Sequence, residues 1–376
     1  MRVVHLARDE KFIPLMQSLF DAANPGANRY VIARRQRRKQ RFVQPADNVV
    51  FRPEWLFRTP LIAGEVRNAD CIVAHSMTTI FAKALRHARP DARVVWLGWG
   101  YDYYPLLEAQ LGDPLLPATR ALTAALRGDD TSRPWWQRLF SRHGDDDAPG
   151  AKRMALSDVA SRLSAYAVLP PEVALLRHAL PQLRGQAHEV PLFTAEDVFQ
   201  KGPQAMEGPD VMLGNSATAS NNHLEALDWL HSRAGSGKLI VPLSYGDTGY
   251  GQRVAAIGRE RFGERLDALT GWMALADYNE RIRHCGFVVM NHRRQQAVGN
   301  VTSALYKGAT VYLRRENPLF DFLAGLGVCL RQIDDSAGAL EALSAQERSR
   351  NREIIGAHYA RARVLSAIRN LLGASH

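Results

Sequence analysis

The first polar segment with the residue types of a ligand site is Leu213–His223, where an apolar run ends at a glycine and small hydroxyl and amide side chains follow. A strand leading into a helix here leaves backbone N–H groups and the positive helix end at the strand edge, which suits a phosphate. Ser220 or Asn221 serving only as a helix N-cap explains the pattern equally well. The segment is neither a G-x-G-x-x-G fingerprint nor a P-loop. The candidate ligands are Gly214, Asn215, Ser216, Ser220 and Asn221.

Two further polar segments follow later apolar runs. Tyr245 comes just after the predicted strand Lys238–Pro242 and can stack on a base or bond a phosphate, although a loop tyrosine is more often only packed. The segment Asn291–Asn300 is densely polar, and protein cores exclude such side chains unless they are hydrogen-bonded. A solvated basic turn is the alternative. In a ligand site, arginines can pair with a diphosphate, glutamines can hold sugar hydroxyls and a glycine allows close approach, which makes candidates of Arg293, Arg294, Gln295, Gln296 and Gly299.

The fourth polar segment, Arg314–Phe320, ends the next predicted strand. Glu316 can accept hydrogen bonds from ribose or sugar hydroxyls, and Asn317-Pro318 is a pattern that starts a helix. A single glutamate after a strand is usually only solvated. Glu316 is nevertheless a candidate, because it belongs to the fourth polar segment at the same predicted sheet edge. Open α/β sheets bind ligands at that edge.

One carboxylate in the N-terminal half stands among aromatic residues. Asp102 follows the predicted strand Arg93–Leu97 within Gly98–Tyr104, a setting that can raise the pKa of its carboxyl and make it a general base for a hydroxyl nucleophile. The flanking Trp99 and Tyr101 suit sugar faces. The alternative is that Asp102 caps a helix beyond it, with the aromatic side chains as packing.

Other titratable residues carry weaker signals. His75, at the end of its own predicted strand, and His5 are further candidate bases, although a single histidine is more often structural. Asp145–Asp147 resembles an acidic metal motif only superficially, because it lies in a polar loop with no buried strand before it. We therefore expect no metal site and no cofactor.

Alternating strand and helix patterns must position these residues, and they predict two parallel α/β sheets covered by helices. The boundary is expected near residue 200, within the linker-like stretch Glu196–Pro209. The expected domains are 1–200, with an insertion at 127–153, and 201–345, followed by a helical tail over 346–376 that can pack back on the first domain. The predicted strands are 2–6, 30–33, 71–75, 93–97, 166–169, 210–214, 238–242, 265–269, 286–291 and 310–313, and the predicted helices are 11–23, 55–63, 78–89, 221–234, 250–261, 273–284 and 299–307.

Length and composition limit the class of protein. The 376 residues exceed one ordinary domain, and 46% hydrophobic with 23% charged residues excludes a disordered or disulfide-rich chain. The formal charge of +10 favours a polyanionic partner. Three separated cysteines, Cys71, Cys285 and Cys329, indicate reduced thiols and a reducing cytoplasm. We expect no signal peptide and no membrane-spanning segment.

A basic run and an aromatic cluster indicate a surface partner. The run Arg34–Arg41 holds six cations in eight residues, and Pro134–Phe140 sets aromatic side chains beside further arginines. Interfacial membrane segments combine these ingredients, and basic runs also bind nucleic acid. A membrane surface is favoured because no nucleic-acid module is visible. The residues expected at the membrane are Arg34, Arg35, Arg37, Arg38, Trp135, Trp136 and Phe140.

Taken together in this order and spacing, GNSATASNNHLEAL, VPLSYG, HRRQQAVGN and RRENPLF resemble the bacterial 4-acetamido-4,6-dideoxygalactose (Fuc4NAc) transferase family of enterobacterial common antigen synthesis, glycosyltransferase family 56, and WGYDYY resembles that family's Trp-Gly-x-Asp-x-Tyr segment. The resemblance is good over about 210–325, patchy over 1–125 and poor over 127–160. Where the family has Gly and Thr, this chain has Ala297 and Asn300.

The resemblance implies a GT-B fold, in which two Rossmann-like parallel-sheet domains face each other across a cleft. It also implies a thymidine-diphosphate (TDP) amino sugar as donor, an undecaprenyl-pyrophosphate-linked saccharide as acceptor, and peripheral attachment to the cytoplasmic face of the inner membrane. Carried over onto this chain, the donor site would include Gly214, Asn215, Ser216, Ser220, Asn221, Tyr245, Arg293, Arg294, Gln295, Gln296, Gly299, Asn300, Glu316 and Asn317. Asp102 would face the acceptor, with Trp99, Tyr101 and His75 near it.

These lines converge on a metal-independent transferase in which Arg293 or Arg294 stabilises the leaving diphosphate. Asp102 is the expected base if the reaction inverts the anomeric centre, and no such base is needed if it retains configuration. A UDP- or GDP-sugar donor is an alternative. The rival from another class is a non-catalytic basic protein that binds anionic lipid or nucleic acid. A nucleotide-sugar epimerase would need the dinucleotide fingerprint that is absent.

Overall fold

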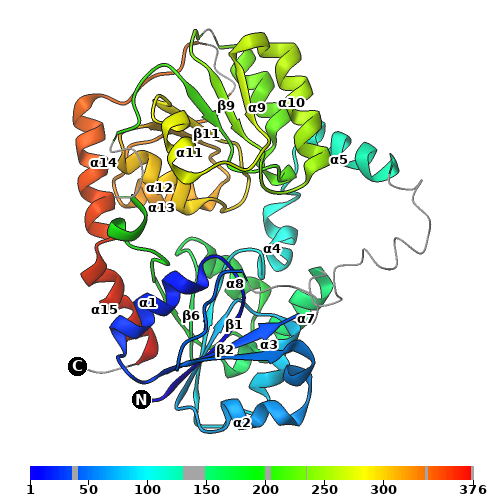
Figure 1. The fold of residues 1–376 in the computed structure, drawn as a ribbon, viewed down its shortest axis with the longest axis vertical. Coiled ribbons are helices and arrows are strands. Elements are labelled where there is room, and N and C mark those ends of the chain that lie inside the picture. The colour runs from blue at the N-terminus through cyan, green and yellow to red at the C-terminus, as the bar shows by residue number, and fades with distance from the viewer. Residues whose placement is uncertain (36–40, 130–148, 200–204, 234, 335–337, 374–376) are drawn as a thin grey trace. The chain divides into compact units, whose positions relative to one another are not determined.

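The computed structural model describes residues 1–35, 41–129, 149–199, 205–233, 235–334 and 338–373, and the chain divides into two compact units. Unit 1 comprises residues 1–110, 141–193 and 361–376, and unit 2 comprises 111–140 and 194–360. Each unit contains one fully parallel β-sheet with helices packed on it (Figure 1). The expected fold class of two parallel α/β domains is confirmed.

The sheet of unit 1 has seven strands in the order β3-β2-β1-β4-β5-β6-β7. Every residue of β4 is buried, as continuous apolar runs in doubly covered parallel sheets require. Strand order reverses between β1 and β4, so the carboxyl ends of these two strands flank the switch point. The strands are β1 (Val3–Arg8), β2 (Asn28–Arg34), β3 (Val49–Pro53), β4 (Cys71–His75), β5 (Arg93–Leu97), β6 (Ala165–Ala167) and β7 (Gln186–His188).

Helices pack on this sheet through their apolar faces. The C-terminal helix α15 (Arg361–Leu372) lies beside α1 (Ile13–Ala23), and Val364 and Ile368 join the same core as Met16 (Figure 1). The helical tail pattern therefore breaks at 359–360, and only its second half packs in unit 1. The other helices are α2 (Ala63–Val66), α3 (Thr79–Leu85), α4 (Tyr104–Leu111), α7 (Pro149–Val159) and α8 (Glu172–Ala179).

The sheet of unit 2 has six strands in the order β10-β9-β8-β11-β12-β13. Strand order reverses between β8 and β11, whose carboxyl ends lead into the first and third polar segments. The strands are β8 (Val211–Leu213), β9 (Leu239–Pro242), β10 (Leu266–Leu269), β11 (Phe287–Met290), β12 (Thr310–Leu313) and β13 (Arg331–Gln332).

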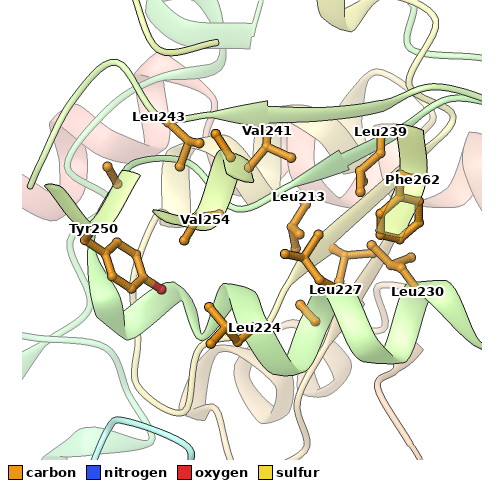
Figure 2. Close-up of a cluster of buried hydrophobic side chains, with 14 of the residues drawn as sticks. Leu213, Leu224, Leu227, Leu230, Leu239, Val241, Leu243, Tyr250, Val254 and Phe262 are labelled. Atoms are coloured by element: carbon orange, nitrogen blue, oxygen red, sulfur yellow. The ribbon is translucent and has the colours of Figure 1, made fainter. Parts of the chain in front are cut away.

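Leucine side chains from α9 pack against strand residues such as Leu239 and Val241 to form the core of unit 2 (Figure 2). The segment with α5 (Pro117–Asp129) also packs here, although the sequence groups it with the first half of the chain. The other helices are α9 (His223–His231), α10 (Thr248–Phe262), α11 (Leu275–Ile282), α12 (Val298–Tyr306), α13 (Pro318–Gly325) and α14 (Ala345–His358).

Several elements differ from the sequence prediction. The helix expected over 55–63 is two 3-10 turns, Glu54–Arg58 and Pro60–Ile62, because Pro60 lacks an N–H donor and restricts the residue before it. The helix expected from 221 begins at His223, because Asn222 has φ +50° in the left-handed region. Strands β3, β7 and β13 were not predicted. In the described part of the chain, no helix is long and apolar enough to cross a membrane.

Candidate active site

The loop after β8 is folded around the side chain of Asn221. Its amide Nδ2 donates to the carbonyl oxygens of Ser216 at 3.1 Å and Thr218 at 3.0 Å. Its Oδ1 accepts from the backbone N–H of Asn215 at 3.1 Å. Gly214 has φ +69°, and a Cβ there would lie 2.8 Å from Asn221 Oδ1. The path of the loop therefore depends on a glycine at 214 and an amide at 221.

Two buried histidines support this loop from within unit 2. His292 Nε2 lies 2.9 Å from Asn221 Oδ1, and His223 Nδ1 lies 3.1 Å from the hydroxyl of Tyr250. Burial lowers the pKa of each imidazole to about 3, so both are neutral near pH 7. Because Asn221 Oδ1 can only accept, His292 donates from Nε2 and holds the loop after β8 to the end of β11.

Asn222 fastens three segments of unit 2 together. Its Nδ2 donates to the carbonyl oxygens of Pro114 at 3.0 Å and Asn291 at 3.1 Å. Its Oδ1 accepts from the N–H of Leu116 at 2.8 Å. Asn291 returns a hydrogen bond from Nδ2 to the Asn222 carbonyl oxygen at 3.0 Å. An asparagine tolerates the left-handed backbone at this position, so it satisfies both the conformation and the hydrogen bonds.

Gln296 links the segment after β11 to the loop after β8. The Ser220 hydroxyl donates to Gln296 Oε1 at 2.6 Å, and Gln296 Nε2 lies 3.4 Å from Asn215 Oδ1. Arg294 Nε donates to the same Oε1 at 3.4 Å. The structure thus brings together four of the residues predicted to bind a donor, and it holds a guanidinium at the β8/β11 switch point.

Helix α12 begins at this position. Its N-cap, Ala297, has φ +56° and ψ +33°, which costs a residue with a Cβ about 1–2 kcal/mol relative to glycine. Gly299 lies in the first turn and is partly buried, and Asn300 is exposed. Ala297 carries no side chain that can cap the helix. The N-terminus of α12 therefore opens beside Arg294 without a side-chain cap from its own N-cap residue.

Other predicted donor residues have different surroundings. Arg293 Nη1 donates to the carbonyl oxygen of Asp113 at 2.7 Å, away from the Arg294 network. Asn317 caps α13 by accepting from the N–H of Leu319 at 3.0 Å and donates to the His292 carbonyl oxygen at 3.2 Å. Its observed contacts are structural. Gln295 is partly buried.

Glu316 is exposed and pairs with Arg314 at 3.2 Å. Burial acts to raise the pKa of its carboxyl, but a backbone hydrogen bond and the nearby Arg314 and Arg293 outweigh burial and lower the pKa. Arg314 also donates to Asn291 Oδ1 at 3.2 Å. Glu316 is therefore a charged acceptor joined, through Arg314, to the polar residues at the end of β11.

Sequence reasoning missed most of the supporting residues. Asn222, Asn291 and His292 fall inside the polar segments that were singled out, but nothing in their types separates support from ligand binding. His223 closes the first polar segment and lies inside the helix predicted over 221–234, and no supporting role was predicted for it. The one available signal was the density of amides and histidines next to apolar strands, since such side chains are buried only when they are hydrogen-bonded.

In unit 1, the carboxylate of Asp102 is 0% exposed and accepts three hydrogen bonds. Its Oδ2 accepts from the N–H of Met77 and from Trp96 Nε1, both at 2.8 Å. Its Oδ1 accepts from the N–H of Trp99 at 2.9 Å. Burial raises the pKa of this carboxyl, and these hydrogen bonds act to lower it. The geometry does not support the predicted base, because it leaves the carboxylate no solvent-facing side.

We expect Asp102→Asn to destabilise unit 1 by about 3 kcal/mol, because an amide group must replace one acceptor oxygen and then faces a buried N–H donor. Chemical denaturation of the purified variant measures the loss. Glu108→Gln, which also replaces a carboxylate by an amide but at an exposed position of α4, is the matched control. If Asp102→Asn kept the wild-type denaturation midpoint but lost turnover, the carboxylate would act as the base after all.

The other residues predicted near an acceptor are spread over the carboxyl edge of the same sheet. Trp99 stacks on Phe12 with ring centroids 5.5 Å apart, and the Tyr101 hydroxyl donates to Glu10 at 3.2 Å. His75 is buried with its Nε2 3.1 Å from His5 Nδ1. Burial holds the pKa of His75 well below its usual value. The side chains that are accessible at this edge of the sheet are therefore those of Trp99, Tyr101 and Glu10, whereas His75 belongs to the core.

The predicted metal and membrane residues are described only in part. The described ranges contain no group of three histidine, cysteine or acidic side chains that can hold a metal ion, and Asp145–Asp147 lies outside them. Arg34 is exposed, and Arg35 pairs with Glu54 at 3.3 Å. Arg37, Arg38, Trp135, Trp136 and Phe140 also lie outside the described residues.

Residues 190–345 match the family model described as 4-alpha-L-fucosyltransferase, glycosyl transferase group 56, which confirms the family resemblance over that part of the chain. This range contains the whole Asn221, Gln296 and Arg294 network. This match, together with the two parallel α/β units and the solved structures described next, makes the protein a glycosyltransferase with the GT-B fold.

Solved glycosyltransferase structures share the fold along the full chain. Sucrose-phosphate synthase from Thermosynechococcus elongatus is similar at a TM-score of 0.64 and 11% identity, with 100% of each chain covered. Anabaena HepE in complex with UDP and glucose is similar at a TM-score of 0.62 and 12% identity, again with 100% of each chain covered. The lipopolysaccharide outer core galactosyltransferase WaaB matches at a TM-score of 0.53 and 8% identity, covering 100% of this chain and 99% of that chain.

Proposed function

We propose that the protein transfers a deoxy-amino sugar of the Fuc4NAc type from a TDP-sugar to a lipid-linked saccharide during bacterial surface polysaccharide synthesis. The observation that carries the donor half is the network at the β8/β11 switch point. There the loop after β8, the start of α12 and the guanidinium of Arg294 converge. Backbone N–H groups, a helix N-terminus and an arginine together recognise a diphosphate.

In the proposed reaction the acceptor hydroxyl oxygen attacks the anomeric carbon, and the bond from that carbon to the diphosphate oxygen breaks. The hydroxyl proton passes to a base if the configuration is inverted, or to the leaving diphosphate if it is retained. The leaving diphosphate takes the electron pair, and Arg294 with the N-terminus of α12 stabilises its charge. Glu316, a charged acceptor at the end of β12, suits hydroxyls of the transferred sugar. Fixed donors supply the stabilisation, so the proposed mechanism does not call on a metal ion.

An inverting reaction needs a base that can reach the acceptor hydroxyl. Glu10 follows β1 at the switch point of the unit 1 sheet and is partly buried, and Tyr101 donates to it. We propose Glu10 in the role first predicted for Asp102. Glu10→Gln would then lower turnover and leave TDP binding unchanged. Equal loss in Glu10→Gln and in a Tyr101→Phe variant would instead indicate that Glu10 only positions Tyr101.

The acceptor and the location are part of the same proposal. A lipid-linked saccharide is presented at a membrane, and the net charge of +10 with the exposed Arg34 favours an anionic surface. Peripheral attachment to the cytoplasmic face of the inner membrane fits this acceptor. A protein that only binds anionic surfaces is the competing account, and it predicts binding that falls steeply with salt and ignores nucleotide sugars.

The donor test is thermal stabilisation by TDP, UDP and GDP. A ligand at 100 times its Kd adds about 2.7 kcal/mol to the free energy of unfolding. We expect TDP to stabilise most, and Arg294→Ala to weaken TDP binding about 10- to 100-fold through loss of charge-assisted hydrogen bonds. Arg259→Ala removes the same charge from the exposed end of α10 and is the control.

Each outcome of this titration has one meaning. Preferential stabilisation by UDP or GDP would keep the transferase and replace the proposed donor. No stabilisation by any of the three nucleotides would contradict the proposed donor site. Equal loss of TDP binding in Arg294→Ala and Arg259→Ala would show that net charge, and not the Arg294 network, holds the nucleotide.

A further inference from the structure

Two large aromatic side chains of unit 2 are almost wholly exposed. Trp272 is 90% exposed and Tyr245 is 73% exposed, the two highest values among the described large hydrophobic side chains. A tryptophan ordinarily buries much of its 150–250 Å² of surface, so leaving it in water forgoes stabilisation. Neither side chain contributes to the core of unit 2.

The two side chains occupy equivalent positions in the loops that follow two neighbouring strands. Strands β9 and β10 are parallel, with Pro242 paired to Leu269 at their carboxyl ends. Tyr245 is the third residue after Pro242, and Trp272 is the third residue after Leu269. The register therefore places both aromatic residues at the carboxyl edge of the sheet, on adjacent loops.

The loop that carries Tyr245 is joined by backbone hydrogen bonds to the loop after β8. The N–H of Ala217 donates to the Tyr245 carbonyl oxygen at 2.6 Å, and the N–H of Asp247 donates to the Ala217 carbonyl oxygen at 2.9 Å. Between them, Gly246 has φ +117°, and a Cβ there would lie 2.5 Å from the Ala217 carbonyl oxygen. The glycine permits this close approach, so the aromatic edge is continuous with the loop that Asn221 folds.

The distance along the sheet suits one kind of ligand. In the order β10-β9-β8-β11, Trp272 follows the strand two places from β8, and adjacent strands lie about 4.8 Å apart. A diphosphate at the β8/β11 switch point, between these two strands, is thus separated from the end of β10 by two and a half strand spacings, about 12 Å. A nucleoside diphosphate lying along the edge spans this distance and brings its base, a flat π-system, to the indole.

We propose that Trp272 is the base-stacking residue of the donor site, with Tyr245 flanking the nucleoside between the base and the diphosphate. This inference rests on the proposed nucleotide-sugar donor. Stacking on an aromatic side chain tolerates any base, so Trp272 supplies affinity for the nucleoside and leaves the choice among bases to other contacts. The energy comes from covering an indole that the free protein leaves in water.

The experiment measures binding of TDP and of inorganic pyrophosphate to the full-length protein and to Trp272→Ala. We expect TDP to bind roughly 10- to 100-fold more weakly to Trp272→Ala. Pyrophosphate, which has no base, is expected to bind both proteins equally. Trp272→Phe is expected to retain most of the TDP affinity. Trp55→Ala, a partly exposed tryptophan of unit 1, is the control, and TDP is expected to quench tryptophan fluorescence in it but much less in Trp272→Ala.

Two outcomes would overturn the stacking role of Trp272 but leave the proposed donor site in place. Unchanged TDP affinity in Trp272→Ala would show that the exposed indole does not stack on the base. Equal weakening of TDP and pyrophosphate would show a general disturbance of the loops. The failure of the wild-type protein to bind TDP, UDP or GDP would instead overturn the proposed donor site, and the stacking role with it.

Discussion

Lowering the pH from 7 to 5 is expected to unfold unit 2 before unit 1. Unit 2 buries His223 and His292, and burial lowers the pKa of each to about 3. The folded state therefore keeps both imidazoles neutral, whereas the unfolded chain protonates them near pH 6.5. Their contribution to stability is complete above pH 6.5 and is lost progressively as the pH falls toward 3.

Between pH 6.5 and 5, His223 and His292 each reduce the free energy of unfolding of unit 2 by about 2 kcal/mol, or about 4 kcal/mol together. Unit 1 buries His5, whose pKa burial lowers to about 3, and His75. It also buries Glu172, whose pKa burial raises to about 7. That carboxyl prefers its protonated form in the fold, so its contribution grows as the pH falls from 7 toward its unfolded value near 4.5. The stability that unit 1 loses through His5 and His75 is therefore partly offset by Glu172.

Urea denaturation at pH 7, 6 and 5 tests this expectation, read from tryptophan fluorescence and from hydrogen exchange resolved to each unit. His223→Gln should reduce the loss between pH 7 and 5 by about 2 kcal/mol. His231→Gln, an exposed position on the same helix, is the matched control. An identical pH dependence in wild type and His223→Gln, or earlier unfolding of unit 1, would contradict the assignment of neutral buried imidazoles.

The sheets were the most predictable part of the molecule. Apolar runs such as Cys71–His75 and Lys238–Pro242 are long enough to mark buried parallel strands, and polar segments after them mark the carboxyl edge. Strands that are short or lie at sheet edges give no such signal, and β13 (Arg331–Gln332) has two residues. Periodicity also cannot assign a helix to a unit, because α5 and α15 are placed by tertiary packing.

The candidate site was also predictable only in part. Residue type and position identified the loop after β8 and the segment after β11, and the structure joins them through Gln296. The sequence could not separate ligands from supports, because Asn317 and Asp102 have the chemistry of binding residues and use it to satisfy buried backbone groups. Trp272 gave no signal either, since exposure is a property of the fold.

Gly214→Ala is expected to abolish donor binding with a larger effect than removal of any single ligand. The residue has φ +69°, which costs alanine about 1–2 kcal/mol. Its Cβ would also lie 2.8 Å from Asn221 Oδ1 and 2.9 Å from His223 Nε2, closer than real Cβ contacts. Asn221 must then release the N–H of Asn215 or His292, so the loop after β8, where we propose that the diphosphate binds, loses its shape.

Gly263→Ala separates the effect of backbone strain from the effect of the close Cβ contacts. Gly263 also lies in unit 2 with φ +55°, but a Cβ there meets no atom within 4 Å. Gly263 has ψ −132°, outside the left-handed helical region, so Gly263→Ala also loses stability through backbone strain, but we expect it to bind TDP normally. Gly214→Ala should add to its backbone strain about 2 kcal/mol for the broken buried hydrogen bonds, and it should lose measurable TDP and pyrophosphate binding. Because the displaced amide orients the loop as a whole, normal TDP binding by Gly214→Ala would place the diphosphate elsewhere on the sheet edge.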